Sequence, residues 1–149
     1  MTMSHNKVFA YTLALLVIGV LHHTDHVLRY DHSGWPFKPD ITAFTFSLLV
    51  YPTILSLLLI NSKAYRVSVS VAIAVVLLGA HTFLETPLDQ FNTWARNHSD
   101  SPHALGQPNL LDIQSPALGA LSVILSMLLN IGVLLLPFIY LREEKFDTK

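Results

Sequence analysis

The chain has 149 residues, of which 52% are hydrophobic and only 13% are charged, and its mean hydropathy is +0.48. Soluble domains carry about a quarter charged residues, so this composition indicates a small integral membrane protein. The formal net charge is -1 and no basic stripe occurs, which argues against a nucleic-acid partner. The chain contains no cysteine, so disulfides, thiolate metal ligands, iron–sulfur clusters and thiol catalysis are excluded.

Four apolar stretches along the chain approach the length that crosses a bilayer as a helix. A membrane-spanning helix needs about 20 predominantly apolar residues. The sequence therefore predicts an all-α fold, an integral membrane four-helix bundle that forms one domain over residues 1–149 in contact with the lipid bilayer. The predicted spans are about 8–29, 42–60, 67–85 and 118–141, and the two long loops are 30–41 and 86–117.

The first apolar stretch also has some features of a secretory signal peptide. Lys7 precedes an uninterrupted apolar run that ends at Leu21. A signal peptide would be followed by a small-x-small cleavage site, but the polar segment 22–26 occupies that place. We therefore expect an uncleaved first helix.

Lysine and arginine are distributed unequally between the two ends of the predicted spans. Six of them lie at the N-terminus, in the short turn after residue 60 and in the C-terminal tail, whereas three lie in or beside the two long loops. The positive-inside rule then predicts cytoplasmic termini and outward-facing long loops. This topology places seven of the eight histidines on the outer side, although histidine did not enter the sidedness argument.

Local signals mark where the helices begin and bend. Ser115-Pro116 is typical of an N-cap followed by the first helical residue, and Asp40 or Thr42 is expected to cap the second span. Residues 61–63 predict a tight polar turn. Pro52 is expected to kink the second span locally.

The long outer loop contains the signature of a short helix that starts at Thr86-Pro87. We expect it to lie in the membrane interface and to cover the outer ends of the spans like a lid. Asp89 and Arg96 are predicted to point toward water. The residues predicted to face the bilayer are Leu88, Phe91 and Trp94 or Ala95.

The outer end of the first span carries an unusual cluster of polar side chains. At 100° per residue, His22, Asp25, His26 and Arg29 fall within an arc of roughly 100° on one helix face. His22 and His26 are four residues apart, so both imidazoles can reach one metal ion. Arg29 is four residues from Asp25 and can pair with it. Ionisable residues at such a position are costly and usually functional.

A second cluster, His81 with Glu85, ends the third span with the same four-residue spacing. Counted at 1.5 Å per residue, His22 lies roughly 21 Å from the start of its span at Val8, and His81 lies roughly 21 Å from Val67. Both helices are predicted to run outward, so the two clusters can meet at one depth. We therefore expect a four-ligand nitrogen and oxygen site under the outer leaflet.

This site predicts a divalent transition metal, namely zinc, copper, iron or manganese. In an enzyme, the metal would activate water or oxygen for an apolar or lipid-like substrate, with Glu85 or Asp25 as a catalytic base when not a ligand. The predicted metal ligands are His22, His26, His81, Glu85 and Asp25.

Three other interpretations fit the same residues. A b-type haem could take one axial histidine from each cluster, with Arg29 pairing with a cofactor propionate. The chain could instead be a non-catalytic accessory subunit of a larger membrane complex, or a homo-oligomer. A face of small and polar residues on the fourth span (Gly119, Ser122, Ser126 and Asn130) is typical of such helix packing. Finally, the His, Asp, Glu and Arg side chains could satisfy one another by hydrogen bonding and bind nothing.

Overall fold

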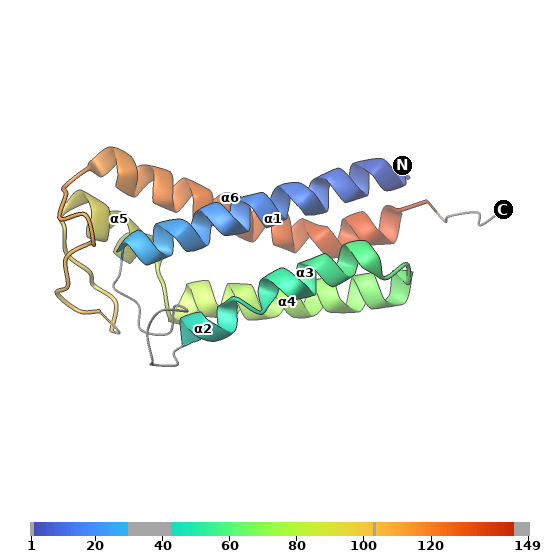
Figure 1. Ribbon diagram of the computed structural model, residues 1–149, viewed down its shortest axis with the longest axis horizontal. Helices are drawn as coiled ribbons and strands as arrows, with labels where there is room; N and C mark the ends of the chain where they lie inside the picture. The colour runs from blue at the N-terminus through green and yellow to red at the C-terminus, as the bar shows by residue number, and fades with distance from the viewer. Residues whose placement is uncertain (1, 30–42, 103, 145–149) are drawn as a thin grey trace.

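The computed structural model of the protein describes residues 2–29, 43–102 and 104–144 (Figure 1). No β-strand occurs within these ranges, which confirms the all-helical prediction. The predicted loop 30–41, the expected cap residues Asp40 and Thr42, and His103 lie outside the described residues. The helices are α1 (His5–Arg29), α2 (Ala43–Ser47), α3 (Val50–Leu59), α4 (Lys63–Phe83), α5 (Pro87–Ala95) and α6 (Pro116–Arg142).

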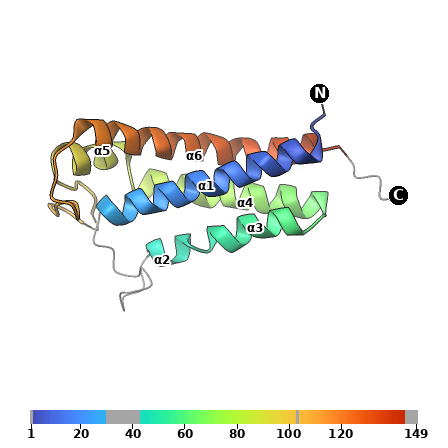
Figure 2. The ribbon, with the colours of Figure 1, turned by 45° about the horizontal axis from the view of Figure 1, so that its top comes forward.

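Three of these helices, α1, α4 and α6, are long and apolar enough to cross a membrane. In Figures 1 and 2, α1 and α4 run in one direction, and α3 and α6 run in the opposite direction. The start of α1 and the end of α6 lie at the same end of the molecule, where Met3 and Glu143 form an isolated β-bridge. The short helix α5 lies at the other end, packed against α6.

Three helices begin with a side-chain cap, at Thr86 and Ser115 as predicted and at Ser62 within the predicted polar turn. The side chains of Ser62, Thr86 and Ser115 each accept a hydrogen bond from the backbone N–H three residues later, at 3.4, 3.2 and 3.3 Å. Proline occupies the first turn of both α5 and α6, where its missing N–H costs nothing. These caps fix the residues at which α4, α5 and α6 begin.

The predicted second span, 42–60, is not one continuous helix but two, with a turn at Leu48–Leu49. Pro52 has no N–H to donate to the carbonyl of Leu48 four residues earlier. That carbonyl instead accepts from the N–H of Tyr51 at 3.2 Å, and the N–H of Leu49 donates to Phe46 at 3.1 Å. These tighter bonds, which span three residues, separate α2 from α3. Pro52 therefore breaks the span, which goes beyond the kink that we predicted.

The hydrophobic core lies between the long helices, with α3 packed against α1 and α4. Leu15, Leu57 and Leu136 are buried there. The outer faces of the same helices expose large apolar side chains, such as Val76 at 72% and Phe138 at 60%. This distribution is the one expected for helices whose outward faces contact lipid rather than water.

Glycine allows α6 to approach its neighbours closely. A Cβ atom at Gly119 would lie 2.7 Å from the backbone oxygen of Phe91 on α5, and one at Gly132 would overlap the side chain of Leu15 on α1. Gly119 and the predicted packing residues Ser122 and Ser126 are buried. The small-residue face of α6 is therefore a packing surface for α1 and α5.

Candidate metal centre

The two predicted clusters meet. His22 on α1 and His81 on α4 lie side by side, with 3.0 Å between their Nε2 atoms. The contact arises because α1 and α4 run in the same direction, so equal distances along each helix lead to the same level (Figure 1). His22 is buried, and His81 is half-buried.

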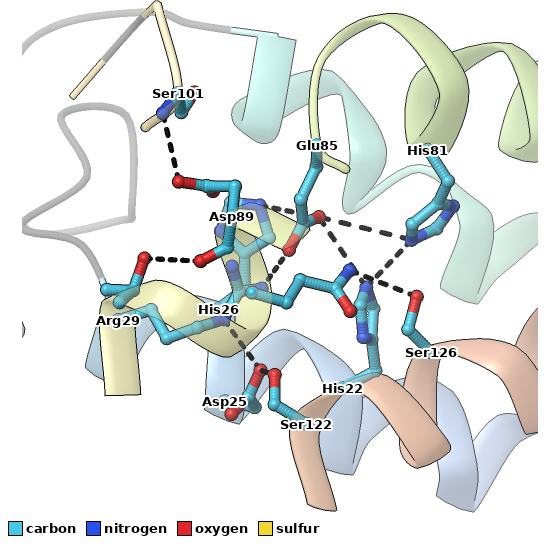
Figure 3. A network of polar contacts seen from close by, with 12 residues as sticks. His22, Asp25, His26, Arg29, His81, Glu85, Asp89, Ser101, Ser122 and Ser126 are labelled. Carbon is cyan, nitrogen blue, oxygen red and sulfur yellow. Dashed lines mark hydrogen bonds and ion pairs between the residues drawn. The ribbon is translucent and has the colours of Figure 1, made fainter. Parts of the chain in front are cut away.

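Glu85 joins this pair from just beyond the end of α4. The helix ends at Phe83, two residues before the predicted boundary. The N–H of Glu85 still bonds the carbonyl of Ala80 at 3.2 Å, so the chain makes one more turn. That turn returns the carboxylate to His81, and Figure 3 shows the three side chains pointing toward one another.

The three facing atoms of this group form a triangle of metal-site dimensions. The Oε2 atom of Glu85 lies 3.9 Å from Nε2 of His22 and 4.0 Å from Nε2 of His81. With the 3.0 Å between the two nitrogens, a point equidistant from all three lies about 2.1 Å from each, which matches zinc bonds to histidine and carboxylate. Among the described residues, His22, His81 and Glu85 are the group whose donor atoms lie close enough together to hold one ion.

The hydrogen bonds of His81 favour presentation of a lone pair to this triangle. Its Nδ1 atom lies 2.9 Å from the carbonyl oxygen of Leu77, which can only accept, so Nδ1 carries the proton. In the neutral ring, Nε2 is then left with a lone pair. A backbone carbonyl that fixes the tautomer of a histidine in this way is a common partner of metal-ligating histidines.

His26 borders the triangle. Its Nε2 atom lies 3.1 Å from Oε2 of Glu85, and its ring stacks on Phe44 with 4.7 Å between the ring centres. The structure therefore brings four predicted ligands, His22, His26, His81 and Glu85, to one location. The donor atoms of His22, His81 and Glu85 surround one point, and His26 contacts the carboxylate of Glu85 from the side.

Asp25, the fifth predicted ligand, lies in a separate hydrogen-bond network. Its carboxylate accepts bonds from Nε1 of Trp94 at 2.8 Å, from Oγ of Ser122 at 2.6 Å and from Nε of Arg29 at 2.8 Å. These partners come from α5, α6 and α1, so Asp25 ties three helices together. It is not a member of the three-residue group that could hold an ion.

Arg29 connects the two networks. It is fully buried, at 0% exposure, and it donates to Asp25 and to the Oε1 atom of Glu85. The bond to Glu85 holds one carboxylate oxygen and leaves Oε2 directed at the histidines (Figure 3). Arg29 therefore positions Glu85; its predicted contact with a cofactor stays a prediction.

The short helix α5 exists as predicted, and Arg96 at its end is exposed as predicted, but the predicted facing of Asp89 and Trp94 was wrong. Asp89, expected in water, is 1% exposed, and its Oδ1 accepts from Oγ of Ser99 and from the N–H groups of residues 100 and 101 at 2.7–2.9 Å. Trp94, expected in the bilayer, is 3% exposed because its N–H bonds Asp25. Leu88 is exposed as predicted. Polar partners inside the molecule bury these two side chains, which amphipathicity alone assigned to water and to lipid.

Sequence reasoning missed a second polar group beside the metal centre. His23 contacts the hydroxyl of Tyr51 through Nδ1 and the hydroxyl of Ser47, at 2.9 Å, through Nε2. Tyr51 donates to the carbonyl of Gly19 at 3.0 Å, so Nδ1 of His23 donates to Tyr51. Nothing in the spacing of the sequence links His23 to α2 and α3, whose positions depend on the break before Pro52.

Both polar groups line a single cavity of about 810 Å³. Its walls are formed by α1, α2, α3, α4 and the loop that follows α5, with two residues of α6. His22, His23, His26, His81 and Glu85 form its polar end. The site is thus a pocket with an apolar body and a histidine-rich end.

Comparison of the chain with protein-family models, curated proteins and solved structures finds no match.

Proposed function

We propose that this chain is a multi-pass membrane protein that crosses the bilayer four times, with both termini in the cytoplasm and a metal centre near the outer interface. The proposal is supported by three long apolar helices and by the location of both chain ends at one end of the molecule. An even number of crossings is needed to return the chain to its starting side. The excess of lysine and arginine at that end favours its placement in the cytoplasm.

The fourth crossing in this proposal is the pair α2 and α3. The apolar segment Phe44–Leu59 is shorter than the other three, at about 24 Å if fully helical. The hydrocarbon core is about 30 Å thick, and a short segment is accommodated by local thinning of the bilayer. The segment runs antiparallel to α1 and α4, as a second crossing must.

The proposed metal centre rests on one observation, the triangle formed by His22, His81 and Glu85. Two histidine nitrogens and one carboxylate oxygen are a donor set for zinc, manganese, iron or copper(II). A site with three protein ligands keeps a position for water or substrate, which is the arrangement of catalytic rather than structural zinc. In that setting Glu85 is a ligand, and Asp25 acts on the centre only through Arg29.

Without a metal, the rings of His22 and His81 share one proton between their Nε2 atoms. Oε2 of Glu85, at 3.9 and 4.0 Å, is too far to accept a hydrogen bond from either of these two rings, and its near partner is Nε2 of His26 at 3.1 Å. A cation at the centre of the triangle would contact all three facing electron-pair donors, whereas the shared proton contacts only the two nitrogens.

Metal analysis of the purified protein tests this proposal. Wild-type protein in detergent is expected to contain about one equivalent of zinc, copper, iron or manganese, and the His22→Ala/His81→Ala double variant is expected to lose it. His98→Ala is the matched control, because His98 is an exposed histidine of the outer loop. Equal, substoichiometric metal in the wild type and the double variant would contradict the proposal.

The same sample tests the haem alternative by its absorption spectrum. A Soret band that is lost in the double variant would show that these histidines bind haem instead of a single metal ion. The direct contact of His22 and His81 argues against a macrocycle between those two rings, since 3.0 Å is a hydrogen-bond distance. A role as an accessory subunit stays a prediction, which co-purification of a larger partner would support.

A further inference from the structure

The cavity beside the metal centre has the size of a ligand site. Its volume of about 810 Å³ lies within the roughly 300–1,000 Å³ typical of pockets for small molecules. One side of it is a stripe along α4, formed by residues spaced three or four apart. The members of the stripe are Val69, Ala72, Ile73, Val76 and Ala80.

The cavity is elongated along the helix axes. It reaches from Val69 to His81 on α4, a distance of about 18 Å at 1.5 Å per residue. On α1 it follows Leu16 and Gly19 to the histidines. The small side chains at Gly19, Ala72 and Ala80 leave the space that a larger residue would fill. This shape suits a long, narrow apolar chain that lies parallel to the helices.

The polarity of the cavity changes from one end to the other. Near Val69 and Val133 its lining is apolar, whereas its other end holds the His/Glu triangle and the hydroxyls of Ser47 and Tyr51. An occupant that satisfies both ends has an apolar tail and a head group that offers oxygen atoms.

The cavity is lined on its α2–α3 and α4 sides by residues on the outer, apolar surface. Phe46, Leu49 and Val76 line it while being 64%, 61% and 72% exposed. In a chain that spans a membrane, these residues face hydrocarbon. A molecule that passes between them arrives from within the bilayer, so it must itself be soluble in lipid.

We propose that the cavity binds a single-chain lipid-type molecule with an oxygen head group, such as a long-chain alcohol, carbonyl compound or fatty acid. The tail lies along the α4 stripe, and the head group lies at the triangle of His22, His81 and Glu85. The position of the head group depends on the proposed metal centre, whereas the binding of the tail depends on the cavity alone. This inference names the substrate class of the centre.

The first test uses hexadecanol with a mid-chain diazirine as a photoreactive probe, on the protein in phosphatidylcholine nanodiscs. Saturable crosslinks are expected on the α4 stripe. Excess hexadecanol or palmitate is expected to displace the probe, whereas hexadecane is not. Preference for palmitate over hexadecanol would identify a charged head group and support the proposal equally. Displacement by hexadecane as effective as by hexadecanol would overturn the head-group assignment.

A cavity-filling substitution provides the matched pair of variants. Ala72→Trp projects a large ring into the cavity, whereas Val75→Trp adds the same ring to α4 at an exposed residue that does not line it. Because the ring overlaps the space of the tail, Ala72→Trp is expected to weaken saturable probe binding about tenfold or more, which corresponds to at least about 1.4 kcal/mol. Val75→Trp is expected to bind as the wild type does. Equal probe binding by the two variants would contradict the proposal.

Metal content separates failure of this inference from failure of the proposed function. Both tryptophan variants are expected to keep the wild-type metal, because neither residue belongs to the triangle. Full metal content without saturable labelling in the wild type would overturn the lipid site alone. Saturable labelling of a metal-free wild type, with hexadecane as good a competitor as hexadecanol, would overturn the metal centre and leave the tail site.

Discussion

At the residue scale, the geometry of the site depends on Arg29. A guanidinium with 0% exposure costs several kcal/mol to desolvate, and opposite charges must offset this. Asp25 on the same helix and Glu85 after α4 supply them. Asp25 is held in turn by Trp94 and Ser122. The orientation of Glu85 toward the histidines therefore depends on contacts that reach α5 and α6.

Removal of the Arg29 charge is expected to destabilise the protein strongly. Arg29→Met leaves one buried carboxylate, Glu85, and one half-buried carboxylate, Asp25, without their cationic partner, which costs about 3–5 kcal/mol in the free energy of unfolding. Denaturation in detergent mixtures measures this loss. Arg29→Lys, which keeps the charge but not the forked geometry, is expected to recover part of it.

The control for this substitution is Arg96→Met, because Arg96 is exposed at the end of α5. Arg96→Met is expected to change stability by less than about 0.5 kcal/mol. A stability of Arg29→Met equal to that of Arg96→Met would contradict the structural role given to Arg29.

The sequence predicted the residues of the site whose partners lie one helical turn away or at a matched depth. The spacing of Asp25 and Arg29 predicted their ion pair, found at 2.8 Å. Equal depth in two outward-running helices predicted the contact of His22 with His81, found at 3.0 Å. The bonds of Asp25 to α5 and α6 could not be predicted, because no periodicity along the chain encodes which remote helix lies opposite a residue.

At the element scale, capping chemistry predicted helix ends better than hydropathy did. The caps of α5 and α6 follow from Thr86-Pro87 and Ser115-Pro116 at the expected positions, and Ser62, which caps α4, lies in the expected polar turn. The break between α2 and α3 was harder to predict, because apolar residues continue through it. A hydropathy profile therefore shows one unbroken apolar stretch. Only the hydrogen bond that Pro52 cannot make separates the two helices.

The orientation of α5 shows the limit of amphipathicity as a guide. Its pattern indicates two faces but not which face is buried. The molecule supplies acceptors and donors that make burial of Trp94 and Asp89 favourable, namely Asp25 for Trp94 and backbone N–H groups for Asp89. The helix therefore docks onto α6 and covers the end of the bundle through polar contacts.

At the scale of the whole molecule, the two ends of the bundle differ. At the end that holds both termini, Arg66 bonds both carboxylate oxygens of Glu143 at 2.9 and 2.8 Å, and His5 approaches the same residue at 2.8 Å. The backbones of Met3 and Arg142 add a hydrogen bond of 2.9 Å. The other end holds the buried histidines, the cavity and the docked α5. One end is closed by ion pairs, and the other carries the candidate chemistry.

The proposed topology predicts opposite labelling of these ends. Because the chain has no cysteine, each introduced cysteine is the sole thiol. A membrane-impermeant maleimide applied to intact cells is expected to label Leu105→Cys in the outer loop. Asn61→Cys, in the turn between α3 and α4, is expected to react only after permeabilisation. Both positions are exposed. Labelling of both variants, or of Asn61→Cys alone, in intact cells would contradict the topology.

The most direct test of the central claim is X-ray absorption spectroscopy at the metal edge of the purified, metal-loaded protein. The proposed centre predicts a first shell of nitrogen and oxygen atoms at about 2.0–2.2 Å that includes two imidazoles, and their loss in the His22→Ala/His81→Ala variant. A first shell of oxygen atoms alone, unchanged by the double substitution, would place the metal elsewhere and contradict the account.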